Sequence, residues 1–177
     1  MLKIIPTSER SLSTEEIVQV HEIMRIAYEV TEEEIWGKNY IRLFIEDYTT
    51  LIEEGNIFVA YLDDVIVGSV HVYRKDESTY TFSLLSSDFK FGGQGIGTAL
   101  INRVEHEARK YHATHIKMEI LRLKDVDIPH KIRLHQYYEK LGYNYTHSED
   151  CSCLIPDWKY KLLIQKSNFD FYSKKLN

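Results

Sequence analysis

Four glycines lie within six residues in the run Gly92-Gly93-Gln94-Gly95-Ile96-Gly97, whose spacing points directly to chemistry. A strand-like segment comes before this run, and Thr98 follows it in a helix-like pattern. Glycine lets the main chain approach a ligand closely and adopt dihedral angles that a side chain forbids, so free N–H groups can converge on an anion. The positive end of the following helix dipole points to the same place. The run therefore predicts a site for a cofactor that carries a pyrophosphate group.

The segments around this loop must hold it in place, and their hydrophobic periods predict a mixture of helices and strands. The expected helices cover residues 14–29, 40–52, 97–111 and 132–141, and the expected strands cover residues 57–62, 65–73, 80–86, 116–121, 143–146 and 158–165. Gly55 and Gly142 are suited to end the second and fourth helices. Gly68 interrupts a strand, which often marks close approach by another backbone. The last residues, 167–177, either extend the sheet or pack on a partner.

Composition and charge limit the class of protein. The chain has 177 residues, of which 44% are hydrophobic, so it can bury the core of a single domain over residues 1–177. Its 22 basic and 27 acidic residues give a net charge of −5, which leaves no basic excess for a nucleic-acid backbone. No apolar run reaches the roughly 18 residues that a bilayer span needs, and the N-terminus lacks the pattern of a signal peptide. We therefore expect a soluble, cytoplasmic protein that binds neither nucleic acid nor membrane.

The two cysteines, Cys151 and Cys153, are too few and too close together for a disulfide framework, which fits a reducing compartment. With His147 they do not have the spacing of a structural zinc site, which uses two paired sets of ligands. We expect free thiols and no metal.

Three pieces of the sequence together resemble the GNAT superfamily of acetyl-CoA-dependent N-acyltransferases, in a poorly characterised subgroup. These pieces are the glycine loop with its helix start (92–100), the hairpin turn at 63–68 and the segment Tyr137-Tyr138-Glu139-Lys140-Leu141-Gly142-Tyr143. The resemblance covers about residues 14–165. It implies an α/β (α+β) fold with a mixed, mostly antiparallel twisted sheet of six to seven strands, about four flanking helices and a splayed parallel strand pair at the cofactor site. It also implies acetyl transfer from acetyl-CoA, with no metal, to a primary amine of a small molecule or peptide.

Two features depart from the family pattern. Gly92 stands where the family usually has Arg or Gln, and the connection over residues 122–130 is longer than the usual short loop that contains Asn. Main-chain amides carry most of the phosphate binding in such loops, so we expect function to survive. A catalytically impaired coenzyme A-binding regulatory domain is the alternative. ATP binding is a further alternative, but the glycines are not followed by the Lys-Ser/Thr pair of ATP-binding loops.

The resemblance assigns the cofactor to main-chain groups between two diverging strands and in the loop. The implied cofactor-binding residues are Leu85, Ser86, Ser87, Gly92, Gly93, Gln94, Gly95, Ile96, Gly97, Thr98 and Lys131. An N–H near residues 85–87 would stabilise an oxyanion. Lys90, Lys131 and Arg133 would reinforce the anion site if they reach the cofactor phosphates, and otherwise they are ordinary surface charges.

The resemblance gives Tyr138 the catalytic role, because a phenol with a pKa near 10 can protonate a leaving thiolate or hold its sulfur. Tyr137, one position earlier on a helix, is expected in the core.

An alkyl ammonium is mostly protonated at neutral pH, so a general base is needed as well. The third strand contains no carboxylate, which leaves Glu119, Asp88 or a water relay. The acidic run 29–34, with Trp36 and Tyr40, either lines the acceptor pocket or is a solvated connector. The acceptor and the oligomeric state stay open, and a homodimer is one of the alternatives.

Overall fold

The computed structural model describes residues 1–177 and contains one seven-stranded sheet in the order β1-β2-β3-β4-β5-β7-β6. The strands are β1 (Leu2–Pro6), β2 (Ile57–Leu62), β3 (Val65–Arg74), β4 (Thr79–Ser87), β5 (His115–Leu123), β6 (Asn144–Asp150) and β7 (Ser167–Lys175). Neighbouring strands are antiparallel except for β4 and β5, which are parallel. The predicted mixed, mostly antiparallel fold is therefore confirmed.

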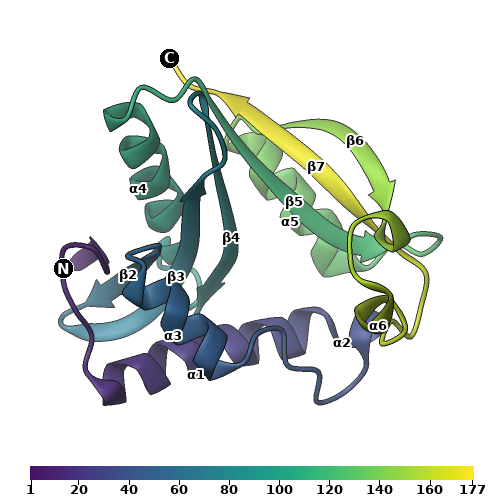
Figure 1. Ribbon diagram of the computed structural model, residues 1–177, viewed down its shortest axis with the longest axis horizontal. Helices are drawn as coiled ribbons and strands as arrows, with labels where there is room; N and C mark the ends of the chain where they lie inside the picture. Colours follow the sequence, from purple (N-terminus) through teal and green to yellow (C-terminus); the bar gives the residue numbers. More distant parts are fainter.

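Strands β4 and β5 separate soon after they meet. They pair only where residues 79–81 lie beside residues 115–117, and the remainder of each strand has no partner on that side. Figure 1 shows the two strands spreading apart from the end near the C-terminus, with helix α1 (Thr14–Thr31) crossing below their open end. The predicted splayed pair is present, and the space between the two strands is where the candidate site forms.

Helices cover both faces of the sheet. Helices α4 (Ile96–Lys110) and α5 (Pro129–Lys140) form one hydrophobic core on the face that includes Phe58 and Ala60 of β2. Helices α1 and α3 (Ile45–Glu53) form a second core with Ile57 and Val59 of the same strand. Since successive strand residues point to opposite faces, the two cores lie on opposite sides of the sheet.

A third, smaller hydrophobic cluster closes one end of the molecule. Residues of α2 (Glu33–Trp36) pack there against the ends of β5 and β7, and the half-buried Tyr160 of α6 (Asp157–Tyr160) packs against them. The short helical turns η1 (Phe89–Phe91) and η2 (Cys151–Cys153) follow β4 and β6 respectively. The cluster holds α2 against the ends of β5 and β7. Because α2 directly follows α1 in the chain, it also positions the end of α1.

Most predicted elements have the expected type, with small shifts at their ends. Helix α5 begins at Pro129, three residues before the predicted start, because a proline is well suited to the first turn of a helix. The second predicted helix is shorter: α3 begins only at Ile45, since Gly37 and Asn39 adopt positive φ angles and residues 37–44 are not helical. Gly68 does lie against another backbone, because a Cβ there would be 2.5 Å from the carbonyl oxygen of Ser86.

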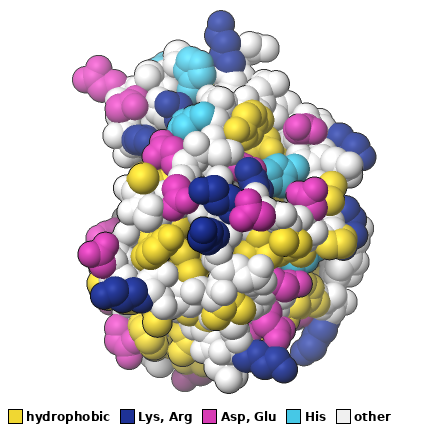
Figure 2. All heavy atoms as spheres, turned by 90° about the vertical axis from the view of Figure 1, so that its right-hand side faces the viewer, with side chains coloured by type: hydrophobic (Ala, Val, Ile, Leu, Met, Phe, Trp, Pro, Cys, Tyr) yellow, Lys and Arg dark blue, Asp and Glu magenta, His cyan; other side chains and the backbone are white.

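The predicted strand at 158–165 is wrong. That segment holds helix α6 and turns, and Trp158, Leu162 and Ile164 are exposed there. Figure 2 views this side of the molecule and shows hydrophobic side chains among acidic and basic ones at the surface. The final strand is instead β7, which lies between β5 and β6 and buries Phe169 and Tyr172. Strand β1 at the N-terminus was not predicted.

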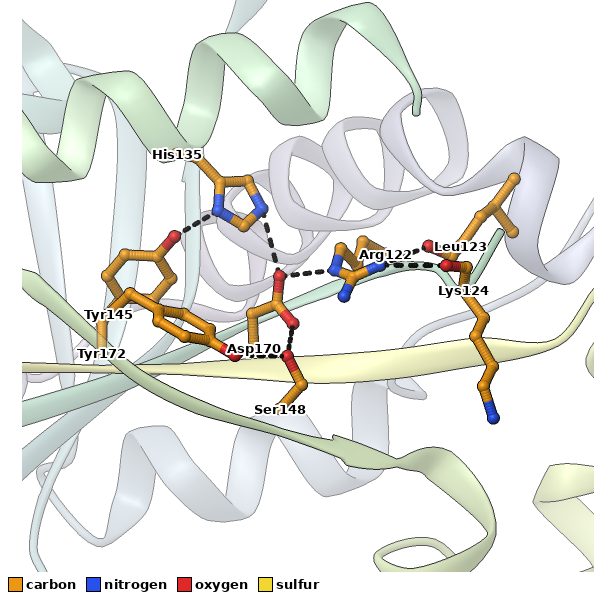
Figure 3. Close-up of polar contacts among 8 residues, drawn as sticks. All are labelled: Arg122, Leu123, Lys124, His135, Tyr145, Ser148, Asp170 and Tyr172. Carbon is orange, nitrogen blue, oxygen red and sulfur yellow. Dashed lines mark hydrogen bonds and ion pairs between the residues drawn. The ribbon is translucent and has the colours of Figure 1, made fainter. Parts of the chain in front are cut away.

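Asp170 joins four elements around the inner part of β7. Its buried carboxylate lies 2.5 Å from Arg122 Nε on β5, accepts a hydrogen bond from Ser148 on β6, and lies 3.7 Å from His135 Nε2 on α5. His135 also shares a hydrogen bond with the Tyr172 hydroxyl (Figure 3). This network fixes α5 against the sheet, and α5 carries residues of the candidate site.

Candidate active site

A groove of about 340 Å³ follows the glycine loop. Its lining consists of residues 85–87, residues 91–98 and Tyr137. The residues predicted to bind the cofactor, except Lys131, therefore line one continuous surface between the end of β4 and the start of α4.

The main chain of the loop offers unused hydrogen-bond donors to this groove. The N–H groups of residues 93–98 donate to no protein acceptor. Gly93 and Gly95 have φ angles of +77° and +75°, and Gly95 caps α4 without a side-chain hydrogen bond. Such a cluster of free amides at a helix N-terminus suits a diphosphate, so the structure fits the predicted anion.

A cavity of about 140 Å³ lies between β4 and β5 and continues this groove. Helices α1 and α5 supply its other walls, and Leu85 contributes to both the groove and the cavity. The pairing of β4 with β3 shifts beside this point, and Leu84 has a φ angle of +51°. A bulge of this kind leaves an unpaired residue in the strand, and it lies where groove and cavity meet.

Tyr138 lines the cavity, as its predicted role requires. Its ring is buried against Phe82 and Tyr143, and its hydroxyl makes no hydrogen bond to protein. Burial raises the pKa of the Tyr138 hydroxyl well above 10, so the phenol keeps its proton at neutral pH. A protonated phenol that faces a cavity can serve as a proton donor.

Tyr137 differs from the prediction that it is a core residue. It packs partly against the core, but its hydroxyl lies 3.0 Å from Thr98 Oγ1 and lines the glycine groove. The two consecutive tyrosines thus face different parts of the same site, because neighbouring side chains on a helix point in different directions.

Glu119 is the predicted general base that lines the cavity. Its side chain is exposed and makes no ion pair or hydrogen bond to protein. Desolvation by the surrounding walls raises the pKa of Glu119, and the charges of Arg42 and Lys75 partly oppose this shift. Asp88 instead accepts a hydrogen bond from the Lys90 N–H outside the cavity. The geometry therefore favours Glu119 over Asp88.

A buried charge cluster forms one wall of the cavity. The Glu32 carboxylate lies 3.6 Å from Arg42 Nη1 and 3.6 Å from Lys131 Nζ, and it accepts a hydrogen bond from the Trp36 indole at 2.9 Å. Burial lowers the pKa of Lys131. Lys131 was predicted beside the cofactor phosphates, and it lies in this cavity and outside the glycine groove because the first turn of α5 faces the end of α1.

The other predicted cations also lie outside the glycine groove. Lys90 lines a separate surface groove beside α1, and Arg133 is exposed. Of the acidic run 29–34, Glu32 lines the cavity, whereas Glu29 pairs with Arg25 on the outer side of α1. No Lys, Arg or His side chain lines the groove, so its positive potential comes from the loop amides and the helix dipole.

A sequence model described as an acetyltransferase (GNAT) domain matches residues 53–145, which include the glycine loop, β5 and the tyrosine pair. The chain belongs to the GNAT acetyltransferase family. It is therefore an acyltransferase, and GNAT acetyltransferases use acetyl-CoA. No curated protein matches the chain by sequence.

Solved GNAT structures share this fold along nearly their whole length. An acetyltransferase from Streptococcus agalactiae is 17% identical, with a TM-score of 0.70, and the match covers 99% of this chain and 98% of that one. The ribosomal-protein-S18-alanine N-acetyltransferase from Escherichia coli is 14% identical, with a TM-score of 0.66 and coverage of 100% and 95%. An aminoglycoside 6'-N-acetyltransferase complexed with coenzyme A is 15% identical, with a TM-score of 0.69 and coverage of 100% and 97%.

The remaining side-chain chemistry of this GNAT chain is sparse. Cys151 is buried and Cys153 is exposed, and both are free thiols. No group of three or more His, Cys, Asp or Glu side chains is arranged to hold a metal ion. None of the helices combines the length and the apolar character needed to cross a membrane.

Sequence reasoning missed Tyr28, Arg42 and His130, which all line the cavity. Arg42 lies in the non-helical segment before α3, and no local pattern marks it. His130 bonds the Thr31 carbonyl at 2.7 Å, which brings the start of α5 and the end of α1 together. A contact between such distant segments has no signal in the spacing of residues.

We expect Gly95→Ala to weaken coenzyme A binding about tenfold. A non-glycine residue costs about 1–2 kcal/mol in the left-handed region, and relief of that strain would turn loop amides away from the diphosphate. Calorimetric titration with coenzyme A measures the change. Gly142→Ala is the matched control, because Gly142 has a similar φ angle of +88° but lies outside the groove. Equal losses of affinity in both variants would contradict a specific role for the loop.

Proposed function

We propose that this GNAT enzyme transfers an acetyl group from acetyl-CoA to a primary amine of a small molecule or peptide, by direct attack while both substrates are bound. One observation carries the proposal: the groove with free amides meets the cavity that holds Tyr138 and Glu119 at the bulge in β4. One acetyl-CoA molecule could then place its diphosphate at the loop and its thioester in the cavity.

The proposed cofactor contacts are mostly with the main chain. The amides of residues 93–98 would hold the diphosphate, with the hydroxyls of Thr98 and Tyr137 beside them. The unpaired edges of β4 and β5 would bind the amides of the pantetheine arm, since neither strand has a partner there. Residues 85–87 line the groove at the point where this arm would enter the cavity.

Acetyl-CoA supplies the activated thioester, and the chain supplies three groups for the transfer. Glu119 would accept the proton from the acceptor amine, directly or through one water, so that the neutral amine can attack. A main-chain N–H at the bulge would donate a hydrogen bond to the carbonyl oxygen as negative charge develops on it. Tyr138 would donate its proton to the leaving sulfur, since burial keeps that hydroxyl protonated.

The test is release of free thiol from acetyl-CoA in the presence of a panel of primary amines, with mass spectrometry of the products. We expect coenzyme A to bind and at least one amine to gain an acetyl group. Binding of coenzyme A without turnover of any amine would support the regulatory alternative instead. Preference for ATP over coenzyme A in calorimetric titrations would contradict the cofactor assignment.

We expect Tyr138→Phe to lower kcat about 10- to 100-fold and to leave the KM for acetyl-CoA nearly unchanged. General acid catalysis contributes at least about 100-fold in many enzymes, but a thiolate with a pKa near 8.5 already leaves readily. Steady-state kinetics measure both constants. Tyr111→Phe removes a hydroxyl from an exposed tyrosine at the end of α4 and serves as the control. A change in KM alone would assign Tyr138 to binding.

A further inference from the structure

We infer that the acceptor is a small amino acid whose free carboxylate binds between Arg42 and Lys131 in the cavity. This inference rests on the proposed function, because it names the class of amine that the same site accepts. It is carried by the buried Lys131 and the partly buried Arg42, whose hydrogen-bond donors the protein leaves unused, and by an unpaired carboxylate that lines the same cavity.

Arg42 has donors without acceptors. Its side chain is 20% exposed and lines the cavity, yet it makes no hydrogen bond to protein. The only ion pair of its guanidinium is the 3.6 Å contact with Glu32, and the group also lies over the Tyr28 ring at 5.4 Å. A guanidinium presents five N–H donors in a fork that matches the two oxygens of a carboxylate. The unused side of this fork is suited to such a ligand.

Lys131 also has hydrogen-bond donors without acceptors. Its side chain is 8% exposed, lines the cavity and makes only the 3.6 Å contact with Glu32. An ammonium group carries three donors, and none of them has a protein acceptor within hydrogen-bond distance. Lys131 also lies in the first turn of α5, where no side chain caps the helix and the dipole favours an anion.

Glu32 does not account for both cations. One of its oxygens already accepts the hydrogen bond from the Trp36 indole, and a single carboxylate faces two positive groups. A buried charge is costly unless it is paired and hydrogen-bonded. The cluster therefore retains one positive charge and several free donors, and a ligand carboxylate would satisfy both.

Glu119 supplies the complementary charge. It extends from β5 into the cavity without an ion pair, so the site combines an unpaired acid with an excess of positive charge. A molecule with an amine and a carboxylate a few bonds apart matches this arrangement, with its amine beside Glu119 and its carboxylate beside Arg42. The two cations favour a free amino acid over a lysine side chain on a protein, which has no carboxylate nearby.

The decisive experiment compares each acid with its own carboxamide. Glycine, alanine, serine, aspartate, glutamate and γ-aminobutyrate are assayed as acceptors beside the corresponding amides, in which the carboxylate charge is removed and the amine is kept. We expect kcat/KM for the preferred acid to exceed that for its amide by about 10- to 100-fold, because hydrogen bonds to charged groups are the stronger ones.

Variants then test whether Arg42 causes this preference. Arg42→Gln should lower the acid-to-amide ratio several-fold, with Lys131 retaining the remainder, and Arg42→Lys should give an intermediate ratio because it keeps the charge but not the fork. Arg25→Gln removes the same charge from the outer side of α1 and should leave the ratio unchanged. The wild-type ratio itself does not depend on whether any variant folds.

The outcomes separate this inference from the proposed function. Turnover of amides or simple alkylamines as fast as acids would overturn the carboxylate site and leave acetyl transfer standing. If no amine reacts, acetyl transfer fails, and titration of the acids and amides into the protein loaded with coenzyme A decides the inference alone. Selective binding of an acid would then support the site, and equal or absent binding of both would overturn it.

Discussion

Glu119→Gln lowers kcat/KM for acetyl transfer by about 100- to 1,000-fold, if Glu119 is the general base of this enzyme. Glutamine keeps the size of the side chain but cannot accept the proton that the acceptor amine must lose. The carboxylate lines the cavity without a partner, so its removal does not break an ion pair or a hydrogen bond. Steady-state kinetics with saturating acetyl-CoA measure the loss.

The pH dependence gives a second readout of the same substitution. Desolvation raises the pKa of Glu119 above that of an ordinary glutamate, and a base works only when it is deprotonated. The wild-type rate should therefore fall as the pH drops through this raised pKa, at a higher pH than an ordinary carboxylate near 4.3 would give. Glu119→Gln should remove this acidic limb.

Glu149→Gln is the matched control, because Glu149 is an exposed carboxylate on β6 outside the cavity. If Glu119→Gln loses no more activity than Glu149→Gln, then Glu119 is not the general base. A water relay that does not involve Glu119 would then take that role. Asp88→Asn tests the other predicted candidate, and we expect it to behave like the control because Asp88 lies outside the cavity.

The parts of the fold that could be predicted are those with local causes. Ser13 caps α1 through a reciprocal contact with Glu16, and the glycine run forces the turn before α4. The apolar stripe of α4 and the continuous apolar run of β2 depend only on residues a few positions apart. These signals lie within a short window of sequence, so they survive without knowledge of the tertiary structure.

Residues 167–177 were expected either to extend the sheet or to pack on a partner, and the structure shows the first as β7. The sequence could not decide between them because the neighbours of β7 decide it. Phe169, Phe171 and Tyr172 stand among polar residues, and Asp170 between them is buried only because Arg122 and Ser148 reach it from other strands. The segment 158–165 has more hydrophobic residues, yet it pairs with no strand. Position in the sheet therefore outweighed local hydrophobicity, as it commonly does for strands.

The candidate site shows the same division. Glu119 and Tyr138 were predicted and do line one cavity, because a strand and a helix with clear patterns carry them. Arg42 was missed and Lys131 was misplaced, because the position of each depends on Glu32 at the end of α1. Residue spacing indicates which face of its own element a side chain occupies, but not which distant element lies opposite.

Asp170 contacts side chains from three other elements of the fold. Among the substitutions considered, its removal should therefore have the largest effect on stability. Asp170→Ala should lower the free energy of unfolding by about 3 kcal/mol, because it leaves Arg122 and Ser148 without their buried acceptor. This is the lower end of the range for breaking a buried ion pair, since Arg122 stays 28% exposed and can recover some hydration. Thermal unfolding should shift by about 6–12 °C for a chain of this length.

Glu22→Gln provides the control, because Glu22 pairs with Arg25 at a similar distance but on the exposed side of α1, where such a pair contributes less than about 1 kcal/mol. The double variant Asp170→Ala with Arg122→Met should recover part of the loss, since it removes the unpaired charge as well. Affinity for coenzyme A should fall less than stability does, because the glycine loop is fixed by β4 and α4 and not by β7. Equal stability of Asp170→Ala and Glu22→Gln would show that α5 is held to the sheet by its hydrophobic face alone.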